Sequence, residues 1–391
     1  MFDRFRQFAT SLLGVGHSQQ IRELYLSTII LQFAASAVMI FEPIYLWSAG
    51  FSLQRIILFY GAIYVVYFAI LPFGGKFVRV HGYEHGIMYS TPFLILYYLS
   101  LFAIPYSPIF IGTAIVSYAL QKMLYWPGYH ADFARFGMAN QTGRELSVLV
   151  LLASIAAIAG PAVGGLVLVT LGYPALFVLV SLLILLSNVP LLLTPEVFTP
   201  RVFSYEDAWK RLWKPENRRR LFSYMGFGEE FIVTIIWPLF MYTVVKEYFN
   251  LGAIVSLATL ATMLVAVAVG RLSDTSSRRR VLRLGVVYTV LSWLMRLVTG
   301  GLGGIFLADT LYRSARTAVG IPLIASTYDA ARRYSVTKTA IFLESSVVAG
   351  KLLAAFLCLI IVTFFAPGWE LMFLLAAAFT LLYALHEPER T

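Results

Sequence analysis

Residues 339–365 read TAIFLESSVVAGKLLAAFLCLIIVTFF, an apolar run interrupted by only two charged side chains, Glu344 and Lys351. A helix rises about 1.5 Å per residue, so about 20 apolar residues cross the hydrocarbon core of a bilayer, which is about 30 Å thick. The run is longer than this minimum. It therefore predicts a helix that spans a membrane.

Other stretches along the whole chain have the same character. Hydrophobic residues make up 59% of the 391 residues and charged residues only 13%, whereas about 25% of the residues in soluble domains are charged. The predicted spans cover residues 23–47, 53–73, 86–104, 107–126, 146–170, 173–194, 220–245, 250–270, 281–299, 302–328, 339–365 and 368–386. The sequence thus predicts an all-α, polytopic membrane protein with twelve transmembrane helices.

The net charge of +10 follows the predicted topology. Of the 30 Lys and Arg residues, only Arg55 and Lys246 lie at odd-numbered connections between spans, and most lie in the terminal segments and the even-numbered connections. Because basic residues favour the cytoplasmic side, we expect both termini in the cytoplasm. The basic charge is thus a topology signal. We expect no nucleic-acid partner, and a location in the inner or plasma membrane of the cell.

The chain repeats itself about halfway along its length. Three matched pairs keep their order at offsets of 195 to 197 positions: Pro43 and Pro238, Gly75 and Gly270, Asp132 and Asp329. We therefore predict two pseudo-symmetric halves of six helices each, residues 1–194 and 220–391, joined by a charged cytoplasmic linker over residues 195–219. Duplicated halves around a site near the membrane midplane are typical of alternating-access transporters.

Residues 270–282, GRLSDTSSRRRVL, connect the eighth and ninth predicted spans. The segment resembles the loop signature of the major facilitator superfamily, roughly G-x-L-a-D-r-x-G-r-r, with a serine in place of the second glycine. The matching residues are Gly270, Leu272, Asp274, Arg278 and Arg279. The resemblance implies a gating loop that favours one access state, in which the aspartate accepts bonds from a helix N-terminus and the arginines anchor at lipid phosphates.

The first half holds a reduced copy of this motif. Gly75 and Gly82 keep the glycine spacing after the second span, but Arg79 stands where the family has aspartate. Asp274 is then expected to carry the role of the family's aspartate alone.

Residues 160–165 in the fifth span read GPAVGG. They resemble the G-P-x-x-G-G core of the family's exporters and antiporters, with Ala156 in place of an upstream glycine. Proline kinks a helix, and glycine lets a neighbouring helix approach closely. The resemblance implies export; close packing alone is the alternative. The residues concerned are Gly160, Pro161, Gly164 and Gly165.

Ionisable side chains at membrane depth are costly and mark functional sites. In the family that the chain resembles, spans 1, 4, 7 and 10 line a central cavity. We therefore expect a cavity for substrate and protons formed by charged and aromatic residues of these spans: Glu42, Lys122, Trp126, Glu229, Glu230, Trp237, Asp309, Arg313 and Arg316. Glu42, in the outer third of its span, is expected to face an external vestibule.

The tenth span carries a narrow polar stripe. Successive helical residues are about 100° apart, which places Asp309, Arg313 and Arg316 within about 60° of arc. Asp309 and Arg313, four positions apart, can pair directly. Arg316 has no partner on its own helix, and we predict that it pairs with Glu229 or Glu230 of the seventh span. The alternative is a purely structural ion-pair network.

Five other residues receive simpler interpretations. Gly226 and Gly228 precede the acids of the seventh span and predict a locally loosened helix. Arg296, near the outer end of the ninth span, is expected to extend to the membrane interface. Glu344 and Lys351, seven positions apart, are expected to pair with each other.

These features favour a secondary active transporter that moves a small solute by alternating access, outward and in exchange for protons. Buried carboxylates such as Glu229, Glu230 and Asp309 can bind protons. Arg313 and Arg316 instead favour an anionic substrate, since guanidinium groups suit carboxylate and phosphate. A lipid flippase or scramblase, or a transport-inactive sensor on the same fold, is the alternative.

The motifs of other protein classes are missing. The sequence has no H-E-x-x-H, G-x-S-x-G or G-x-x-x-x-G-K-[ST] segment, so we expect neither enzyme activity nor ATP-driven transport by this chain. The single cysteine, Cys358, lies within a span, and we expect no metal or other cofactor. We expect a monomer whose partners are the solute, protons and membrane lipids.

Overall fold

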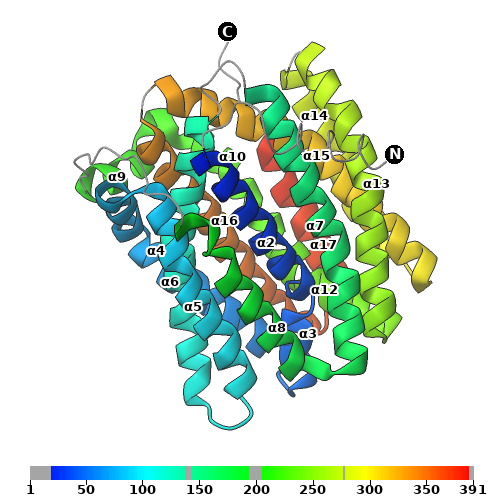
Figure 1. Ribbon diagram of the computed structural model, residues 1–391. Coiled ribbons are helices and arrows are strands. Elements are labelled where there is room, and N and C mark those ends of the chain that lie inside the picture. The colour runs from blue at the N-terminus through cyan, green and yellow to red at the C-terminus, as the bar shows by residue number, and fades with distance from the viewer. Residues whose placement is uncertain (1–18, 137–141, 193–204, 276–277, 334, 387–391) are drawn as a thin grey trace, which may run out of the picture.

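The computed structural model describes residues 19–136, 142–192, 205–275, 278–333 and 335–386. Helices cover nearly all of these ranges, and no strand occurs within them. The longer helices run side by side as a bundle, and the short helix α9 (Tyr205–Trp213) lies at one end of it (Figure 1). The prediction of an all-α protein is confirmed.

Each predicted span of the first half falls on a helix or on consecutive helices. These are α2 (Gln19–Val38), α3 (Glu42–Ser48), α4 (Leu53–His81), α5 (Tyr83–Ala103), α6 (Ile109–Phe136), α7 (Thr142–Thr170), α8 (Gly172–Ser187) and the short η1 (Pro190–Leu192).

The second half follows the same rule, but its first span is divided into short pieces with different helical pitch. Its elements are η2 (Pro215–Asn217), α10 (Arg218–Met225), η3 (Gly226–Gly228), α11 (Glu229–Phe231), η4 (Ile232–Ile236), α12 (Trp237–Val245), α13 (Tyr248–Thr275), α14 (Arg278–Met295), η5 (Arg296–Val298), α15 (Gly301–Arg333), α16 (Val336–Phe365), α17 (Trp369–Leu382) and η6 (Tyr383–Leu385).

Eight helical segments of the described chain are long and apolar enough to cross a membrane: Leu26–Ser48, Leu53–His81, Tyr83–Ala103, Gly172–Leu192, Pro215–Val245, Tyr248–Val265, Arg278–Val298 and Val336–Phe365. Two shorter apolar helices, Ser154–Thr170 and Trp369–Leu385, accompany them. Large apolar side chains such as Leu58 and Phe356 remain exposed on the outside of the bundle. Long apolar helices with exposed apolar faces mark the chain as a membrane protein.

Helix packing follows one scheme in each half of the chain. In the first half, α6 packs on α4 and α5, α2 packs on α7 and α8, and α5 packs on α8. In the second half, α15 packs on α13 and α14, the short helices α10 to α11 pack on α16 and α17, and α14 packs on α17. Helices α7 and α13 join the two halves on one side, and α4 and α16 join them on another.

The predicted linker contributes a packed helix to the bundle. The Trp209 ring of α9 lies 5.2 Å from the Phe68 ring of α4, and Leu212 is buried. The second part of the linker therefore packs against α4 of the first half and α16 of the second half. Residues 195–204 of the predicted linker lie outside the described residues.

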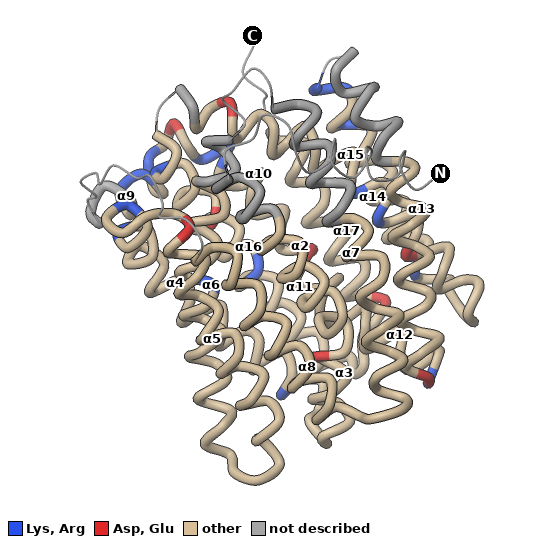
Figure 2. The backbone as a smooth tube through the Cα atoms, in the orientation of Figure 1, with Lys and Arg blue, Asp and Glu red and all other residues tan. Residues whose placement is uncertain are grey.

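Lysine and arginine residues gather at the end of the bundle where α9 and α10 lie, and few are found at the opposite end (Figure 2). Arg55, just after the start of α4, and Lys246, which follows α12, belong to the opposite end by their place in the helices. Lys246 adopts the left-handed conformation (φ 57°) that ends α12. The uneven distribution of charge that the sequence predicts is thus present in space.

Both predicted gating loops are mostly helical. Gly270 and Asp274 lie in the last turns of α13, and Gly75 is buried within α4, so the prediction of a loop at these positions is wrong. Only Gly82 separates α4 from α5, and its φ of 118° is a conformation that glycine adopts at low cost. The side chain of Asp274 lies outside the described residues.

Candidate functional site

A cavity of about 150 Å³ lies between the two halves of the chain. Helices α4 and α6 of the first half and η3, α11, α15 and α16 of the second half supply its wall. The lining residues are Tyr64, Tyr67, Lys122, Trp126, His130, Phe227, Glu230, Ile324, Leu343, Glu344, Val347, Val348 and Lys351. The wall is thus half apolar and aromatic, and half polar with five ionisable groups.

One face of α6 supplies three of the polar and aromatic lining residues. Lys122, Trp126 and His130 follow one another at intervals of four, so they lie on the same side of the helix. The sequence predicts the first two as cavity residues, but the predicted span ends at residue 126 and omits His130. The helix continues through Pro127 to Phe136. The four-residue spacing beyond the proline is the signal that would have identified the histidine.

The two acids of the cavity are paired with cationic or protonatable groups of other helices. Lys351 Nζ lies 2.9 Å from Glu230 Oε2, and His130 Nε2 lies 2.8 Å from Glu344 Oε1. Tyr67 donates a further hydrogen bond of 2.8 Å to Glu344. The prediction that Glu344 and Lys351 pair with each other is wrong, because each points to a different neighbouring helix.

Lys122 differs from the other cation of the cavity. No carboxylate among the described residues lies within ion-pair distance of its ammonium group. The group instead lies 4.2 Å from the centroid of the Tyr118 ring and 5.7 Å from that of Tyr64. An aromatic face stabilises a cation by about 0.5–2 kcal/mol without cancelling its charge. Lys122 therefore remains available to an anionic ligand in the cavity.

Behind Glu230, ion pairs continue through Arg316 to Glu229. Arg316 lies 3.3 Å from Glu230 Oε1 and, through Nε, 2.7 Å from Glu229 Oε1. The predicted pairing of Arg316 with Glu229 or Glu230 is confirmed, with both acids. Since Lys351 also contacts Glu230, two cations and two acids form one network beside the cavity.

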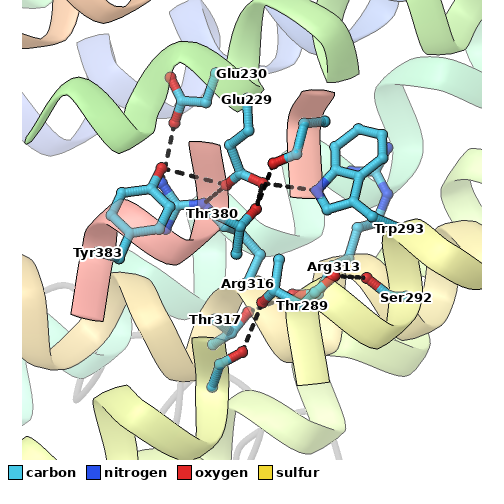
Figure 3. Close-up of polar contacts among 12 residues, drawn as sticks. Glu229, Glu230, Thr289, Ser292, Trp293, Arg313, Arg316, Thr317, Thr380 and Tyr383 are labelled. Atoms are coloured by element: carbon cyan, nitrogen blue, oxygen red, sulfur yellow. Dashed lines mark hydrogen bonds and ion pairs between the residues drawn. The ribbon is translucent and has the colours of Figure 1, made fainter. Parts of the chain in front are cut away.

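Glu229 is completely buried, and four donors surround its carboxylate (Figure 3). Trp293 Nε1 donates a bond of 2.8 Å and Thr380 one of 2.9 Å to Oε2, while Tyr383 donates one of 3.2 Å to Oε1. A buried carboxylate is tolerated when a cation and further hydrogen bonds satisfy its oxygens. These contacts hold Glu229 behind the cavity wall rather than in it.

The helix is irregular around these acids, but at Gly226 and Gly228, where the sequence predicts a loosened helix, it is tightened. Gly226–Gly228 form a tighter helical turn, η3, and a wider π-helical turn, η4, follows α11. A Cβ on Gly228 would lie 2.7 Å from the Gly350 carbonyl, and a Cβ on Gly350 would lie 2.3 Å from that of Met225. Glycine on both helices thus lets the backbones touch, which brings Glu230 within reach of Lys351.

A second buried cluster surrounds Asp309, away from the cavity. Arg313 Nε lies 2.5 Å from Asp309 Oδ2, which confirms the predicted pair, and Trp237 Nε1 donates a bond of 3.0 Å to Oδ1. Arg296 Nη2 lies 3.8 Å from the same carboxylate. Trp237 and Arg313 are therefore placed in this cluster and not among the residues that line the cavity.

Arg296 is 1% exposed, so the prediction that it extends to the membrane interface is wrong. Its guanidinium lies 4.0 Å from the ring centroids of both Trp237 and Trp293, and 4.4 Å from that of Tyr312. Flat guanidinium groups stack well on aromatic faces. The three rings explain why this arginine is stable inside the bundle.

Glu42 is also buried, at 3% exposure, and does not face an external vestibule as predicted. It begins α3, where Pro43 occupies the first turn. Its two oxygens accept hydrogen bonds of 3.0 Å from Tyr97 and 2.8 Å from Tyr98, both on α5. No Lys, Arg or His of the described chain lies within ion-pair distance of this carboxylate.

The glycines of the fifth span lie at two close helix contacts. A Cβ on Gly160 would lie 1.9 Å from Ser36 Oγ, and one on Gly164 would lie 1.8 Å from the Ala37 carbonyl, so α7 touches the backbone of α2. A Cβ on Gly165 would lie 2.6 Å from the carbonyl of Tyr248 at the start of α13. The predicted close packing at these glycines is confirmed.

Pro161 belongs to the same contact between the halves. A Cβ on Gly252 of α13 would lie 2.1 Å from the Pro161 carbonyl, and Ser256 of α13 accepts a hydrogen bond of 3.1 Å from the backbone N–H of Ala162. The GPAVGG segment thus contacts both α2 within its own half and α13 of the other half.

Among the gating-motif residues, Arg278 makes a defined contact. Its Nη1 lies 2.6 Å from Asp329 Oδ2 near the end of α15, and both side chains are partly exposed. The pair links the first turn of α14 to α15. Arg279 follows it in α14 and is exposed.

No group of three or more His, Cys, Asp or Glu side chains that could hold a metal ion occurs in the part of the chain that the structure describes. No known protein-family model matches the chain, and no curated protein matches it. The function therefore has to be argued from the site.

Proposed function

We propose that the chain is a secondary active transporter that moves a small solute by alternating access. The observation that carries this proposal is the position of the cavity. Both halves of the chain contribute to its wall, and lysine, glutamate and histidine side chains meet there in an otherwise apolar bundle. Charged groups are placed at membrane depth only where they serve binding or ion movement, or pair with one another. A site between two movable halves is what alternating access requires.

The packing scheme supports twelve spans in two pseudo-symmetric halves. Every helix contact described above for the first half has an equivalent in the second: α6 with α4 and α5 matches α15 with α13 and α14, and α5 with α8 matches α14 with α17. The contacts between the halves, α7 with α13 and α4 with α16, are equivalent as well. This arrangement, with the motif resemblances, is the basis for assigning the chain to the major facilitator superfamily.

The close contact between α7 and α13 supports movement of one half against the other. The two backbones meet directly at Gly165 and Gly252. Such a flat contact can slide or rotate without repacking large groups. The basic end of the bundle then faces the cytoplasm and holds both termini, in the inner or plasma membrane of the cell.

We further propose that transport is coupled to protons and serves export of the solute, and that the protein acts as a monomer with membrane lipids as its surroundings. Five of the expected residues fall in the cavity or in the ion-pair network beside it: Lys122, Trp126, Glu229, Glu230 and Arg316. The proposal includes no enzymatic step and no cofactor.

Alternating access can be tested without knowing the solute, because the chain has a single cysteine, the buried Cys358. A Val347→Cys variant in a Cys358→Ser background places one thiol on the cavity wall. A membrane-impermeant thiol reagent should modify it from either side of the membrane, in vesicles of known orientation. A lipid-facing Leu58→Cys variant is the control and should stay unmodified by the same reagent.

Modification of Val347→Cys from one side only would contradict alternating access. The same vesicles can be assayed for movement of a fluorescent phospholipid between leaflets. Lipid movement that depends on the protein, together with one-sided modification, would support a flippase or scramblase instead. One-sided modification without lipid movement would support a sensor.

A further inference from the structure

The membrane-embedded charges of the described chain pair with one another, with two exceptions. Glu229 pairs with Arg316, Glu230 with Lys351 and Asp309 with Arg313, while Glu344 pairs with His130. Arg296 lies against Asp309 within its aromatic surroundings. Glu42 and Lys122 remain, both in the first half and neither in an ion pair.

These two groups face each other through a layer of tyrosines. Tyr97 donates a hydrogen bond of 3.0 Å to Glu42, and its ring stacks on that of Tyr118 at a centroid distance of 4.2 Å. The ammonium of Lys122 lies over the same Tyr118 ring, 4.2 Å from its centroid. The carboxylate and the ammonium therefore act on each other across two aromatic rings without touching.

Within the described part of the chain, no charged group other than Lys122 acts on Glu42. The helices packed around it present tyrosines, which are neutral near pH 7, and Lys122. The titratable groups that face Glu42 are Tyr60 on α4, Tyr97 and Tyr98 on α5, and Tyr118 and Lys122 on α6. From α12, Tyr242 instead donates a hydrogen bond to Tyr248. Among the described residues, Lys122 is thus the only charge compensation of Glu42, whereas Glu344 and Glu230 also act on Lys122.

We propose that Lys122 binds the carboxylate of a small, apolar monocarboxylate and that Glu42 takes up a proton when this anion binds. This inference rests on the proposed transport function and specifies its substrate class and coupling. Its second part follows from charge balance. An anion on Lys122 cancels the only cation near Glu42, and an isolated carboxylate in a low-dielectric interior is costly, so Glu42 becomes protonated.

The cavity defines the kind of anion. Its acids are already paired, so Lys122 is the cation open to a ligand. Trp126, Phe227 and several aliphatic side chains such as Val348 form the rest of the wall and suit an apolar body. A cavity of about 150 Å³ is similar in size to one that holds a benzene molecule, which limits the ligand to a small organic anion.

The balance of charge sets the direction of coupling. One monoanion and one proton bind to the same state, so the loaded site has the same net charge as the empty one. The solute and the proton then cross the membrane together, and the protein exports the acid whenever its concentration is higher inside. Movement of the solute and the proton in the same direction thus replaces the exchange of solute for protons that the sequence favours.

Proton uptake can be measured directly on the purified protein in weakly buffered detergent solution with a pH-sensitive dye. The probes are the sodium salts of acetate, butyrate, lactate and benzoate, with binding followed by tryptophan fluorescence. The protein should take up about one proton for each butyrate bound, and its affinity should rise about tenfold for each unit of pH decrease over the range of full uptake.

Variants separate the two roles. Glu42→Gln should bind butyrate without proton uptake and with an affinity that no longer depends on pH, whereas Lys122→Met should lose binding at least tenfold and Lys122→Arg should retain it. Glu247→Gln, an exposed acid after α12, is the matched control and should behave as the unaltered protein. A circular-dichroism spectrum and a melting curve confirm that each variant is folded.

Proton uptake that persists in Glu42→Gln would overturn the role of this acid, and unchanged binding in Lys122→Met would overturn the anion site. Failure of all four probes to bind at millimolar concentration would overturn the substrate class. Flux of the bound probe into proteoliposomes tests the transport function separately. Binding with proton uptake but without flux would refute transport alone, and flux with coupling intact in Glu42→Gln would refute this inference alone.

Discussion

Replacing Arg316 by methionine removes the cation from the buried ion pair with Glu229. The two groups lie 2.7 Å apart, and their side chains are 15% and 0% exposed. Coulomb's law with an effective dielectric constant of about 20 gives about 6 kcal/mol of attraction at this distance, which offsets the cost of removing both ions from water. Without Arg316, Glu229 stays buried with hydrogen bonds but no cation. We expect Arg316→Met to lower the free energy of unfolding by about 3–5 kcal/mol.

The free energy of unfolding can be measured in mixed detergent micelles by tryptophan fluorescence, with Trp293 close to the altered pair. The double variant Arg316→Met/Glu229→Gln removes both charges and should recover most of the loss, because the glutamine no longer needs a cation. Arg313→Met, one turn away on α15, is the matched control. Its side chain is 34% exposed, and Asp309 keeps Trp237 as a donor, so we expect a loss of about 1 kcal/mol.

Two results would refute this reasoning. If Arg316→Met lowers the free energy of unfolding by no more than Arg313→Met does, burial of the Arg316–Glu229 pair does not set its contribution to stability. If the double variant loses as much as the sum of its single changes, the two side chains do not interact, and the pair contributes nothing beyond the packing of each residue.

Three further predictions concern packing, pH and a buried cation. Gly164→Ala places a Cβ 1.8 Å from the Ala37 carbonyl and should lower the free energy of unfolding by at least about 2 kcal/mol. Gly112→Ala is the control, because its Cβ meets nothing within 4 Å, and it should leave the free energy of unfolding unchanged in the same denaturation assay. Burial, and secondarily a nearby arginine, lowers the pKa of His386, which follows the last apolar helix, Trp369–Leu385, to about 4 from about 6.5. The melting temperature should therefore fall as the pH falls from about 6.5 to about 4, and His386→Gln should flatten this part of the curve. An equal slope in both proteins would contradict the assignment. Arg296→Met should change the free energy of unfolding by no more than about 1 kcal/mol, because the lost contact with the aromatic rings is offset by the removal of a buried charge. A loss of stability as large as that of Arg316→Met would show that Arg296 is an essential partner of the Asp309 cluster.

Much of the fold could be predicted because it depends on local properties of the chain. Every predicted apolar stretch falls on a helix, since a membrane requires backbone hydrogen bonds to be made within the segment. The pair Asp309–Arg313 follows from helical spacing alone. The partner of Arg316 could be predicted because few acids lie on the helices expected to line the cavity. Glu229 and Glu230 are the two acids of one such helix.

Other parts of the site could not be predicted, because they depend on how helices rotate and at what depth they meet. Glu344 and Lys351 lie on one helix with a spacing that allows pairing, yet His130 and Glu230 on neighbouring helices are closer to them. Arg296 has the position of an interfacial residue in the sequence, but three aromatic rings from different elements enclose it.

The helical, apolar and membrane-suited character of the chain, and the residues that carry charge at membrane depth, can be read from the amino-acid order. These properties depend on composition and periodicity, which each segment contains without reference to the others. Which charges compensate each other depends on the packing of the helices. Since the energy of a buried charge depends on atoms within a few ångströms, it took the packed bundle to separate Glu42 and Lys122 from the paired groups.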